Sequence, residues 1–307
     1  MKIALLSSNE WLERLDSFGR RHPFLHPGWM ASAAEELSMT LELAEFSIDG
    51  KDFIAPIFYD KDNKFSFSAI GYGGAVELSD TRCLDREGVA AVQLANHLEK
   101  AGKGHFYRSV GLPLPICTDN GENAFPKAET AVIPLAANVE ETFSRILTGN
   151  VRTAIRKAQA SGVTCRELGA QDIKPLHKLI VSTQTNVGSA YLTRLEFITS
   201  LFNLEQPDVK FFGAFVGDNL ASGVILLADG EHAFHYLHGW NRDQSGLCVN
   251  QAVLWYAVAH AIRTGRHWFN MGASHTKPLL HAKLRWGARI ERYLSMDSSD
   301  MPIEKTS

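Results

Sequence analysis

The sequence lacks several features by which a protein of this size is often recognised. It has only four cysteines in 307 residues, and no two of them form a CxxC pair. This spacing argues against both a zinc knuckle and a small disulfide scaffold. We therefore expect four reduced thiols, at Cys83, Cys117, Cys165 and Cys248.

An excess of charge and a long apolar run are missing as well. The chain has 31 Lys and Arg residues against 34 Asp and Glu residues, so its formal charge is −3 and nothing global indicates DNA or an anionic membrane as a partner. The longest apolar stretch, around 252–262, is too short to span a bilayer, and residues 1–8 hold only a short apolar run. We expect a cytoplasmic protein without membrane insertion.

The common motifs of nucleotide-dependent enzymes and hydrolases are also absent. The segment Gly71-Tyr-Gly-Gly74 follows a predicted strand but opens no helix, so it is not a dinucleotide fingerprint. Neither a Walker loop nor a GxSxG elbow occurs. Redox, kinase and hydrolase functions therefore lose their main support.

What the sequence does contain is the same unit twice, over residues 41–111 and 210–272. Each copy predicts three strands joined by tight turns, then a helix, at 87–101 or 249–264, and then a short buried strand. Each helix ends in a glycine. Such runs also occur by chance in α/β proteins, but here the lengths and the order of the predicted elements agree between the two copies.

The two copies predict two domains. A polar, Gly- and Pro-containing stretch at 118–127 separates the copies, and a strand at 129–134 is expected to close the first. Two helices and a strand over 139–168, followed by two more helices, make the second copy fuller. We predict an α/β fold with a mixed sheet (α+β) in two tandem domains, 1–135 and 136–307.

Basic residues gather near the end of the chain. Between Arg263 and Arg292 there are seven of them against one acid, which suggests an anionic ligand, although solvated faces of a helix and a strand would look the same. Lys283 stands out because it lies in a short helical turn after Pro278, just before the final strand. Its side chain can point over the carboxyl end of the central strand, where open α/β sheets bind ligands.

Two further segments are candidates for anion binding. Arg152 and Arg156 are four residues apart and share one helical face, which fits a phosphate clamp or an ordinary surface equally well. The loop before the helix at 249–264 brings free backbone amides to a helix N-terminus, where they can hold a pyrophosphate, although an ordinary helix-entry loop is as compatible. The candidate residues there are Ser245, Gly246 and Asn250.

The strand at 232–239 holds the candidate proton carriers. His232, His235 and His238 are spaced by three, and because residues three apart on a strand point to opposite faces, we expect no shared metal ion. Tyr236 and His238 are expected to share a face with His232 and Phe234. Either of the two can carry a proton, whereas most histidines on strands are simply packed or hydrogen-bonded.

Several segments together resemble one family. The duplicated unit, the segment RTAIRKAQASGV, the helix ending in RTGRHWFNMGAS and the closing HAKLRWGA resemble FemAB-like proteins, which pair two GNAT acyltransferase-type domains. The likeness covers most of the chain. The most specific part is an aromatic-acid-aromatic-Gly strand followed by a Phe-Lys-x-x-aromatic-Gly turn, matched by 268–272 and by Lys283, Trp286 and Gly287. Asn270 replaces the frequent Asp, and Ala282 replaces the Phe.

The resemblance implies N-acyl transfer. Known members transfer aminoacyl groups from tRNA to a cell-wall precursor, and relatives use acyl-CoA thioesters on amino groups. The sequence has no long helical hairpin insertion of the kind found in some cell-wall members, which favours acyl-CoA as the co-substrate. The expected reaction is direct attack by a small-molecule or peptide-like amine, without a metal. The alternatives are an aminoacyl-tRNA-dependent transferase and, because of Asn270 and Ala282, an inactive binding or scaffolding protein.

The resemblance also implies roles for the candidate residues. Acyl transfer needs a neutral amine, a carbonyl within its reach, and donors aimed at the oxygen that becomes negative. We expect Lys283 to stabilise charge at the carbonyl or the donor's phosphates, amides near His238 to bind the carbonyl, and Ser245 with Gly246 to hold the pyrophosphate. His238 or Tyr236 would carry the proton. The first domain is expected to act on the acceptor side or to be structural.

Overall fold

The computed structural model of the protein describes residues 1–115, 125–205, 207–274 and 276–300. The chain forms two compact units, one built from Met1–Thr130 together with the segment that starts at Ile290, the other from Ala131–Arg289. The segment from Ile290 is thus part of the first unit, although the predicted second domain includes it. Cys117 and the predicted linker up to residue 124 lie outside the described residues.

The first unit is a mainly antiparallel sheet with helices. Its strands follow the order β1-β2-β3-β4-β6-β14, with β5 beside β3 and β7 beside β14. The strands are β1 (Ile3–Leu5), β2 (Thr40–Ile48), β3 (Lys51–Tyr59), β4 (Lys64–Ser66), β5 (Val76–Glu77), β6 (His105–Val110), β7 (Leu114–Pro115) and β14 (Arg289–Asp297). The helices are α1 (Ser8–Ser17), η1 (Pro23–Leu25), α2 (Pro27–Glu36), α3 (Leu84–Lys100) and η4 (Ser298–Asp300).

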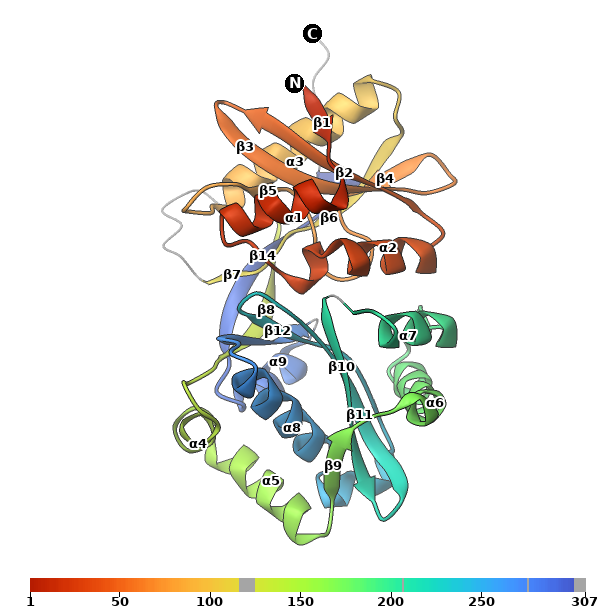
Figure 1. The fold of residues 1–307 in the computed structure, drawn as a ribbon, viewed down its shortest axis with the longest axis vertical. Helices are drawn as coiled ribbons and strands as arrows, with labels where there is room; N and C mark the ends of the chain where they lie inside the picture. Colours follow the sequence, from red (N-terminus) through yellow and green to blue (C-terminus); the bar gives the residue numbers. More distant parts are fainter. Residues whose placement is uncertain (116–124, 206, 275, 301–307) are drawn as a thin grey trace. The chain divides into compact units, whose positions relative to one another are not determined.

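Alternating side chains along β2 and β3 divide this sheet into two faces. Phe46 and Phe53 belong to a core that also includes the apolar side of α3. Glu45 points the other way and pairs with Arg14 of α1 at 2.8 Å. Figure 1 shows α1 and α2 on the face opposite α3. A capping box between Ser7 and Glu10 explains where α1 begins.

The second unit has a mixed sheet in the order β8-β13-β12-β11-β10-β9. Its strands are β8 (Lys127–Pro134), which crosses the unit boundary, β9 (Thr164–Glu167), β10 (Asp208–Val216), β11 (Asn219–Asp229), β12 (His232–Trp240) and β13 (Trp268–Ala273). The helices are α4 (Val139–Glu141), the π-helical turn η2 (Thr142–Ile146), α5 (Gly149–Ala160), α6 (Ala170–Asn186), α7 (Leu195–Phe202), η3 (Arg242–Leu247), α8 (Val249–Arg263) and α9 (Lys277–Leu284).

Helices cover both faces of this sheet. The apolar sides of α5 and α8 share one core with Val224 and Leu226 of β11. On the opposite face, α6 and α7 lie against the sheet, and Phe202 of α7 packs on Phe211 with ring centroids 5.4 Å apart (Figure 1). Gly239 permits this packing, because a Cβ there would lie only 2.4 Å from the backbone nitrogen of Ile180 in α6. Both faces of this sheet are therefore buried under helices.

The predicted repeat is confirmed. In the first unit β2, β3 and β4 are antiparallel neighbours, and β6 follows α3 to lie parallel to β4. In the second unit β10, β11 and β12 repeat this order, and β13 follows α8 to lie parallel to β12. The mixed α/β fold class is confirmed with it.

Candidate functional site

The candidate site lies where β12 and β13 separate. The two parallel strands pair only from His232 with Trp268 to Phe234 with Asn270. Beyond these pairs β12 continues to Trp240 and β13 to Ala273, so their carboxyl ends diverge within the described strands. Backbone N–H and C=O groups at such a divergence lack a neighbouring strand to bond, and they need another partner.

A β-bulge reshapes β12 at this point. Leu237 pairs with Ile225 of β11, but the next pair joins His235 to Leu226, so Tyr236 is the extra residue. Strand alternation therefore shifts by one position between His235 and Leu237. The expectation that His235 and His238 point to opposite faces is wrong for this reason: their ring centroids are 5.4 Å apart.

The same bulge separates Tyr236 from His238. His238 is paired with Val224, which lies in the core under α8. Tyr236 instead packs edge-on against Phe197 of α7, with ring centroids 6.4 Å apart. The expectation that Tyr236 and His238 share a face is therefore wrong. The proposed role of Tyr236 as a proton carrier stays a prediction, from the α7 side of the sheet.

His238 is bound into a small polar network. Its Nε2 lies 2.9 Å from Oγ of Ser222 and 3.2 Å from Oδ1 of Asn250, and the Ser222 hydroxyl donates to Asn250 Oδ1 at 2.8 Å. Burial lowers the pKa of His238 to about 4, against a smaller opposing effect of the Asn250 hydrogen bond. His238 is therefore neutral at pH 7 and has a lone pair available for a proton.

Lys283 occupies the divergence from the other side. Helix α9 begins at Lys277 and is capped by the side chain of Thr276, and its last turn carries Lys283 inward, where it is buried. Its Nζ donates to the carbonyl oxygens of Gly272 and Ala273, both at 2.7 Å. These are carbonyls at the end of β13, so Lys283 supplies the partners that the diverging strand lacks.

The burial of Lys283 also shapes the electrostatics of the site. Burial lowers the pKa of Lys283 to about 8, so the ammonium form still prevails at pH 7. The pKa of His235 lies well below its usual range because of burial, the nearby His238 and the positive charge of Lys283. One cation and two neutral imidazoles thus lie together at the divergence.

The other residues of the family-like tail hold this arrangement. Asn270 is buried, and its Oδ1 accepts the Gly272 amide at 2.7 Å, which shapes the last turn of β13 before the Lys283 contacts. Gly287 has φ of +77°, and a Cβ there would lie 2.1 Å from the Ile146 carbonyl oxygen. Ala282 is exposed, so the missing Phe leaves no hole in the core at that position.

The loop after β12 is placed as an anion site would require. Ser245 and Gly246 are exposed in η3, and α8 starts directly behind it. No side chain caps α8 at Cys248, and its first turn holds no acidic residue. The first amides of an α-helix have no partner within the helix, and its dipole favours an anion there. The side chain of Asn250 points inward to Ser222, so only its backbone amide belongs to this site.

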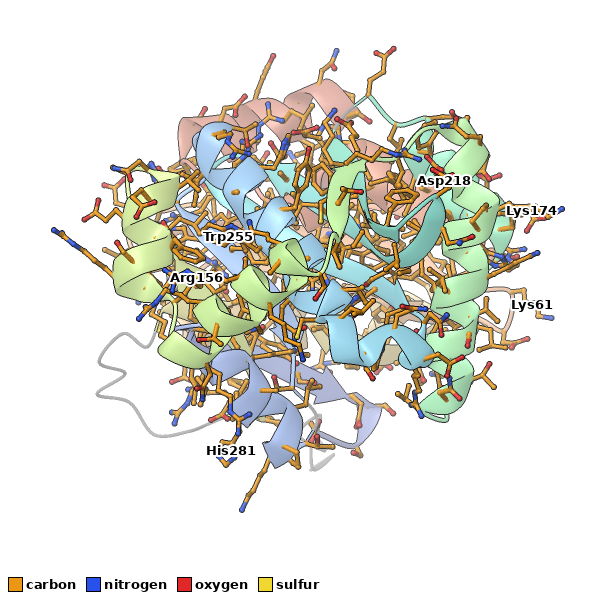
Figure 2. All side chains as sticks on the ribbon, turned by 90° about the horizontal axis from the view of Figure 1, so that it is seen from below. Lys61, Arg156, Lys174, Asp218, Trp255 and His281 are labelled. Carbon is orange, nitrogen blue, oxygen red and sulfur yellow. The ribbon has the colours of Figure 1, made fainter. Side chains whose placement is uncertain are left out.

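Arg152 and Arg156 contact a different segment. Nη1 of Arg152 donates to the carbonyl of Ser144 at 3.0 Å and to that of Leu147. The Arg156 guanidinium lies 5.3 Å from the ring centroid of Phe143, and that ring lies 5.2 Å from the ring of Trp255; Figure 2 labels Arg156 and Trp255. Both arginines therefore pack α5 on the residues before it, and their role in donor binding stays a prediction.

The basic tail is partly used for structure as well. Arg266 donates to the Gly230 carbonyl and lies near Asp208, and Arg289 stacks over Trp268 at 4.3 Å from its ring centroid. Arg292 lies on β14 of the first unit. Lys283, by contrast, reaches the divergence of β12 and β13, where it bonds two carbonyls at the end of β13.

Two residues of the site were missed from the sequence. Strict alternation along the strand excludes His235, but the bulge at Tyr236 interrupts that alternation. Ser222 was overlooked, although it is a polar residue inside the apolar run of β11 and is completely buried. A hydroxyl in such a run needs a buried partner, and that requirement is the signal that could have found it.

Two kinds of feature are absent from the part of the chain that the structure describes. In residues 1–115, 125–205, 207–274 and 276–300, no group of three or more His, Cys, Asp or Glu side chains is arranged to hold a metal ion. Within those same ranges no helix combines the length and apolar character that crossing a membrane requires.

Comparisons with known proteins agree with this geometry. Residues 147–278 match the family described as the Acetyltransferase (GNAT) domain. The chain contains a segment that is similar to a GNAT-type acetyltransferase domain. Its matched segment contains β12, η3, α8 and β13, which are the elements around the divergence. No curated protein matches the sequence significantly.

Several solved structures share the fold of this chain. The crystal structure of FemX is 14% identical, with a TM-score of 0.67, over 95% of this chain and 96% of its own. The C-terminal domain (DUF2156) of a putative lysylphosphatidylglycerol synthetase from Agrobacterium fabrum is 12% identical, with a TM-score of 0.55, over 96% and 95%. A tandem GNAT protein from the clavulanic acid biosynthesis pathway is 9% identical, with a TM-score of 0.51, over 96% and 98%. The expected FemAB-like fold is confirmed.

Proposed function

We propose that the second unit transfers an acyl group from an acyl-CoA thioester to an amino group. The observation that carries this proposal combines the end of β12 with the loop and helix that follow it. β12 diverges from β13 after Phe234, and the loop that follows β12 leads into an α8 N-terminus without a cap or an acid. The first feature can admit a thioester and the second can bind the pyrophosphate of its carrier.

The spacing of these features fits a donor with a long arm. A strand rises roughly 3.3 Å per residue, so the loop beyond Trp240 begins some 15 Å past His235. CoA joins its pyrophosphate to its thioester through an extended pantetheine arm of that kind. Lys283 then lies at the thioester end of the donor, which favours a role at the carbonyl over a role at the phosphates.

The reaction follows from the charges at the divergence. The amine nitrogen attacks the thioester carbonyl carbon, a C–N bond forms, and the C–S bond then breaks to release the CoA thiolate. His238, neutral at pH 7, takes the proton that the attacking nitrogen loses, and this proton can pass on to the thiolate. The Lys283 ammonium stabilises the negative charge that develops on the carbonyl oxygen.

Donor binding and product formation test this proposal separately. Coenzyme A and acetyl-CoA should raise the melting temperature, since a ligand at 100 times its Kd stabilises a protein by about 2.7 kcal/mol. Incubation with acetyl-CoA and a panel of amines and short peptides should then give acetylated products by mass spectrometry, with CoA released in equal amount. A melting temperature that neither ligand moves would overturn the acyl-CoA proposal.

The likeness to FemX and to the lysylphosphatidylglycerol synthetase domain supports a second candidate, an aminoacyl-tRNA donor. The name of the synthetase points to a lysyl group as the acyl unit. If this candidate holds, tRNA should bind and its affinity should fall steeply with salt, because phosphate contacts release counterions. Binding of tRNA without any response to CoA would favour this donor.

A further inference from the structure

We infer that Ser222 and Asn250 are positioning residues, which hold His238 as the neutral tautomer with its hydrogen on Nε2 and leave Nδ1 as the proton acceptor. The use of this tautomer in catalysis rests on the proposed acyl transfer. The tautomer itself can be tested without any substrate.

The three residues come from three elements that enclose the divergence. Ser222 lies on β11, His238 on the neighbouring β12, and Asn250 in the first turn of α8 above them. Ser222 is two positions from Val224, the cross-strand partner of His238, so their side chains are diagonal neighbours on one face. Ser222 is completely buried. Its hydroxyl therefore depends on these partners, because water does not reach it.

The distances select the position of the hydrogen on His238. Ser222 has one hydroxyl hydrogen and two possible acceptors for it, Asn250 Oδ1 at 2.8 Å and the Gly239 carbonyl at 3.3 Å. The hydrogen goes to Asn250, because two oxygens 2.8 Å apart without a hydrogen between them would repel. The Ser222 oxygen is then an acceptor toward His238 Nε2 at 2.9 Å, and Asn250 Oδ1 is another at 3.2 Å. A hydrogen on Nε2 satisfies both acceptors. A bare Nε2 would face two lone pairs.

The groups around His238 also determine how strongly its neutral form is favoured. The titratable groups near His238 are His235, whose ring centroid lies 5.4 Å away, and Lys283, whose charge together with burial and His238 keeps the pKa of His235 well below its usual range. Asn250 is a neutral acceptor, so it orients the imidazole without favouring imidazolium as strongly as a carboxylate would. His238 thus keeps an unprotonated nitrogen at a site that also holds a lysine ammonium.

The deciding experiment is an NMR titration of protein labelled with ¹⁵N-histidine, with His238 assigned by the His238→Gln variant. In the unmodified protein we expect the ¹⁵N shifts of a neutral ring protonated at Nε2, persisting well below pH 6.5. In Asn250→Asp, a carboxylate would replace the amide oxygen and favour imidazolium, so the pKa should rise by about 1–3 units. Asn219→Asp adds the same charge at an exposed position of β11 and should leave His238 unchanged.

The outcomes separate this inference from the proposed function. A neutral His238 with its hydrogen on Nδ1 in the unmodified protein overturns the inference, whatever the donor is. If the tautomer is as expected but no acyl-CoA binds, the network stands and the proposed donor fails. If the enzyme does acetylate an amine, the acid limb of kcat/KM in Asn250→Asp should move to higher pH together with the NMR titration. Ser222→Ala should weaken the Nε2 preference without adding charge, so the conclusion does not depend on the folding of Asn250→Asp.

Discussion

The two units share one topology, but the pair of parallel strands at the centre of each differs. In the first unit the pairing of β4 with β6 continues beyond the strands: Phe67 donates to the Arg108 carbonyl at 2.9 Å, Val110 to Ser68 Oγ at 3.1 Å, and Gly73 to the Val110 carbonyl at 2.7 Å. In the second unit β12 and β13 diverge, and Lys283 bonds the carbonyls at the end of β13. The same connectivity is closed in one copy and open in the other.

The helix after each meander differs in the same sense. The first turn of α3 contains Asp85 and Glu87, and the buried Glu87 is held by Arg82 through two bonds of 2.6 and 2.7 Å. The first turn of α8 contains no acid. The acidic residues in its first turn complement the positive end of α3, whereas the first turn of α8 has no acid and so leaves that end for the anion of the proposed donor. The two units thus share one scaffold, and these local differences are the reason why the proposed function assigns the donor to the second of them.

Removing the lysine of the open pair should have the largest effect on activity. Lys283→Met keeps the length of the side chain but removes the charge and both hydrogen bonds to β13. We expect acyl transfer to fall by about 10²–10³-fold, as for the loss of a donor to a developing oxyanion. Lys64→Met, at an exposed position of β4 in the closed pair, is the matched control and should retain activity. The measurement is kcat on folded protein. Equal losses of kcat in both variants would contradict the conclusion that the open pair of strands, and not the closed pair, takes part in catalysis.

Acid should weaken both units, because each holds a neutral buried histidine. Burial lowers the pKa of His26 in the first unit and of His238 in the second to about 4, from 6.5. Between these pH values the unfolded chain binds more protons, so the free energy of unfolding falls as the pH drops from about 6.5 to about 4. Each histidine contributes at most about 3 kcal/mol to this loss.

Urea titrations between pH 7.5 and 4.5 measure this loss. His26→Gln should remove the part of this pH dependence that comes from the first unit, and His238→Gln should remove the part that comes from the second. A free energy of unfolding that stays flat over this interval would contradict the neutral state of both histidines.

A negative charge in the loop before each long helix should affect only one of them. Ser245→Asp places a carboxylate at the α8 N-terminus, where it competes with the pyrophosphate, and we expect roughly a tenfold loss in CoA affinity. Thr81→Asp, exposed before α3, makes the same change in the first unit and should leave CoA binding intact. Isothermal titration calorimetry with CoA measures the affinity of both variants. A tenfold loss of CoA affinity in Thr81→Asp would contradict the assignment of the donor site to the second unit.

Loosening the closed pair should cost stability without affecting catalysis. Ser68→Ala removes the acceptor of the buried Val110 amide, which costs about 1–3 kcal/mol in the free energy of unfolding. The exposed Ser17→Ala, whose hydroxyl bonds only within α1, should change stability by less than about 0.5 kcal/mol. A drop in kcat for Ser68→Ala that exceeds its loss of folded protein would show that the closed pair takes part in catalysis.

The order of elements was predictable because it depends on short-range pattern. Alternating apolar residues and tight turns indicate β10, β11 and β12, and an apolar stripe ended by Gly265 indicates α8. Membership of the units was harder to predict. β14 pairs with β6 and β7 of the first unit, although it directly follows the lysine turn of the second. No local pattern states which distant strand a strand will join.

The sequence by itself determined the repeated unit, the family-like tail and the choice of Lys283, because each is written in consecutive residues. Only the tertiary structure decided which side chains meet at the divergence. The bulge at Tyr236 exists in the register between β11 and β12, and this single extra residue turns His235 to the side of His238 and Tyr236 away. Side-chain direction on a strand has a period of two, so one inserted residue reverses a prediction that counts along the strand alone.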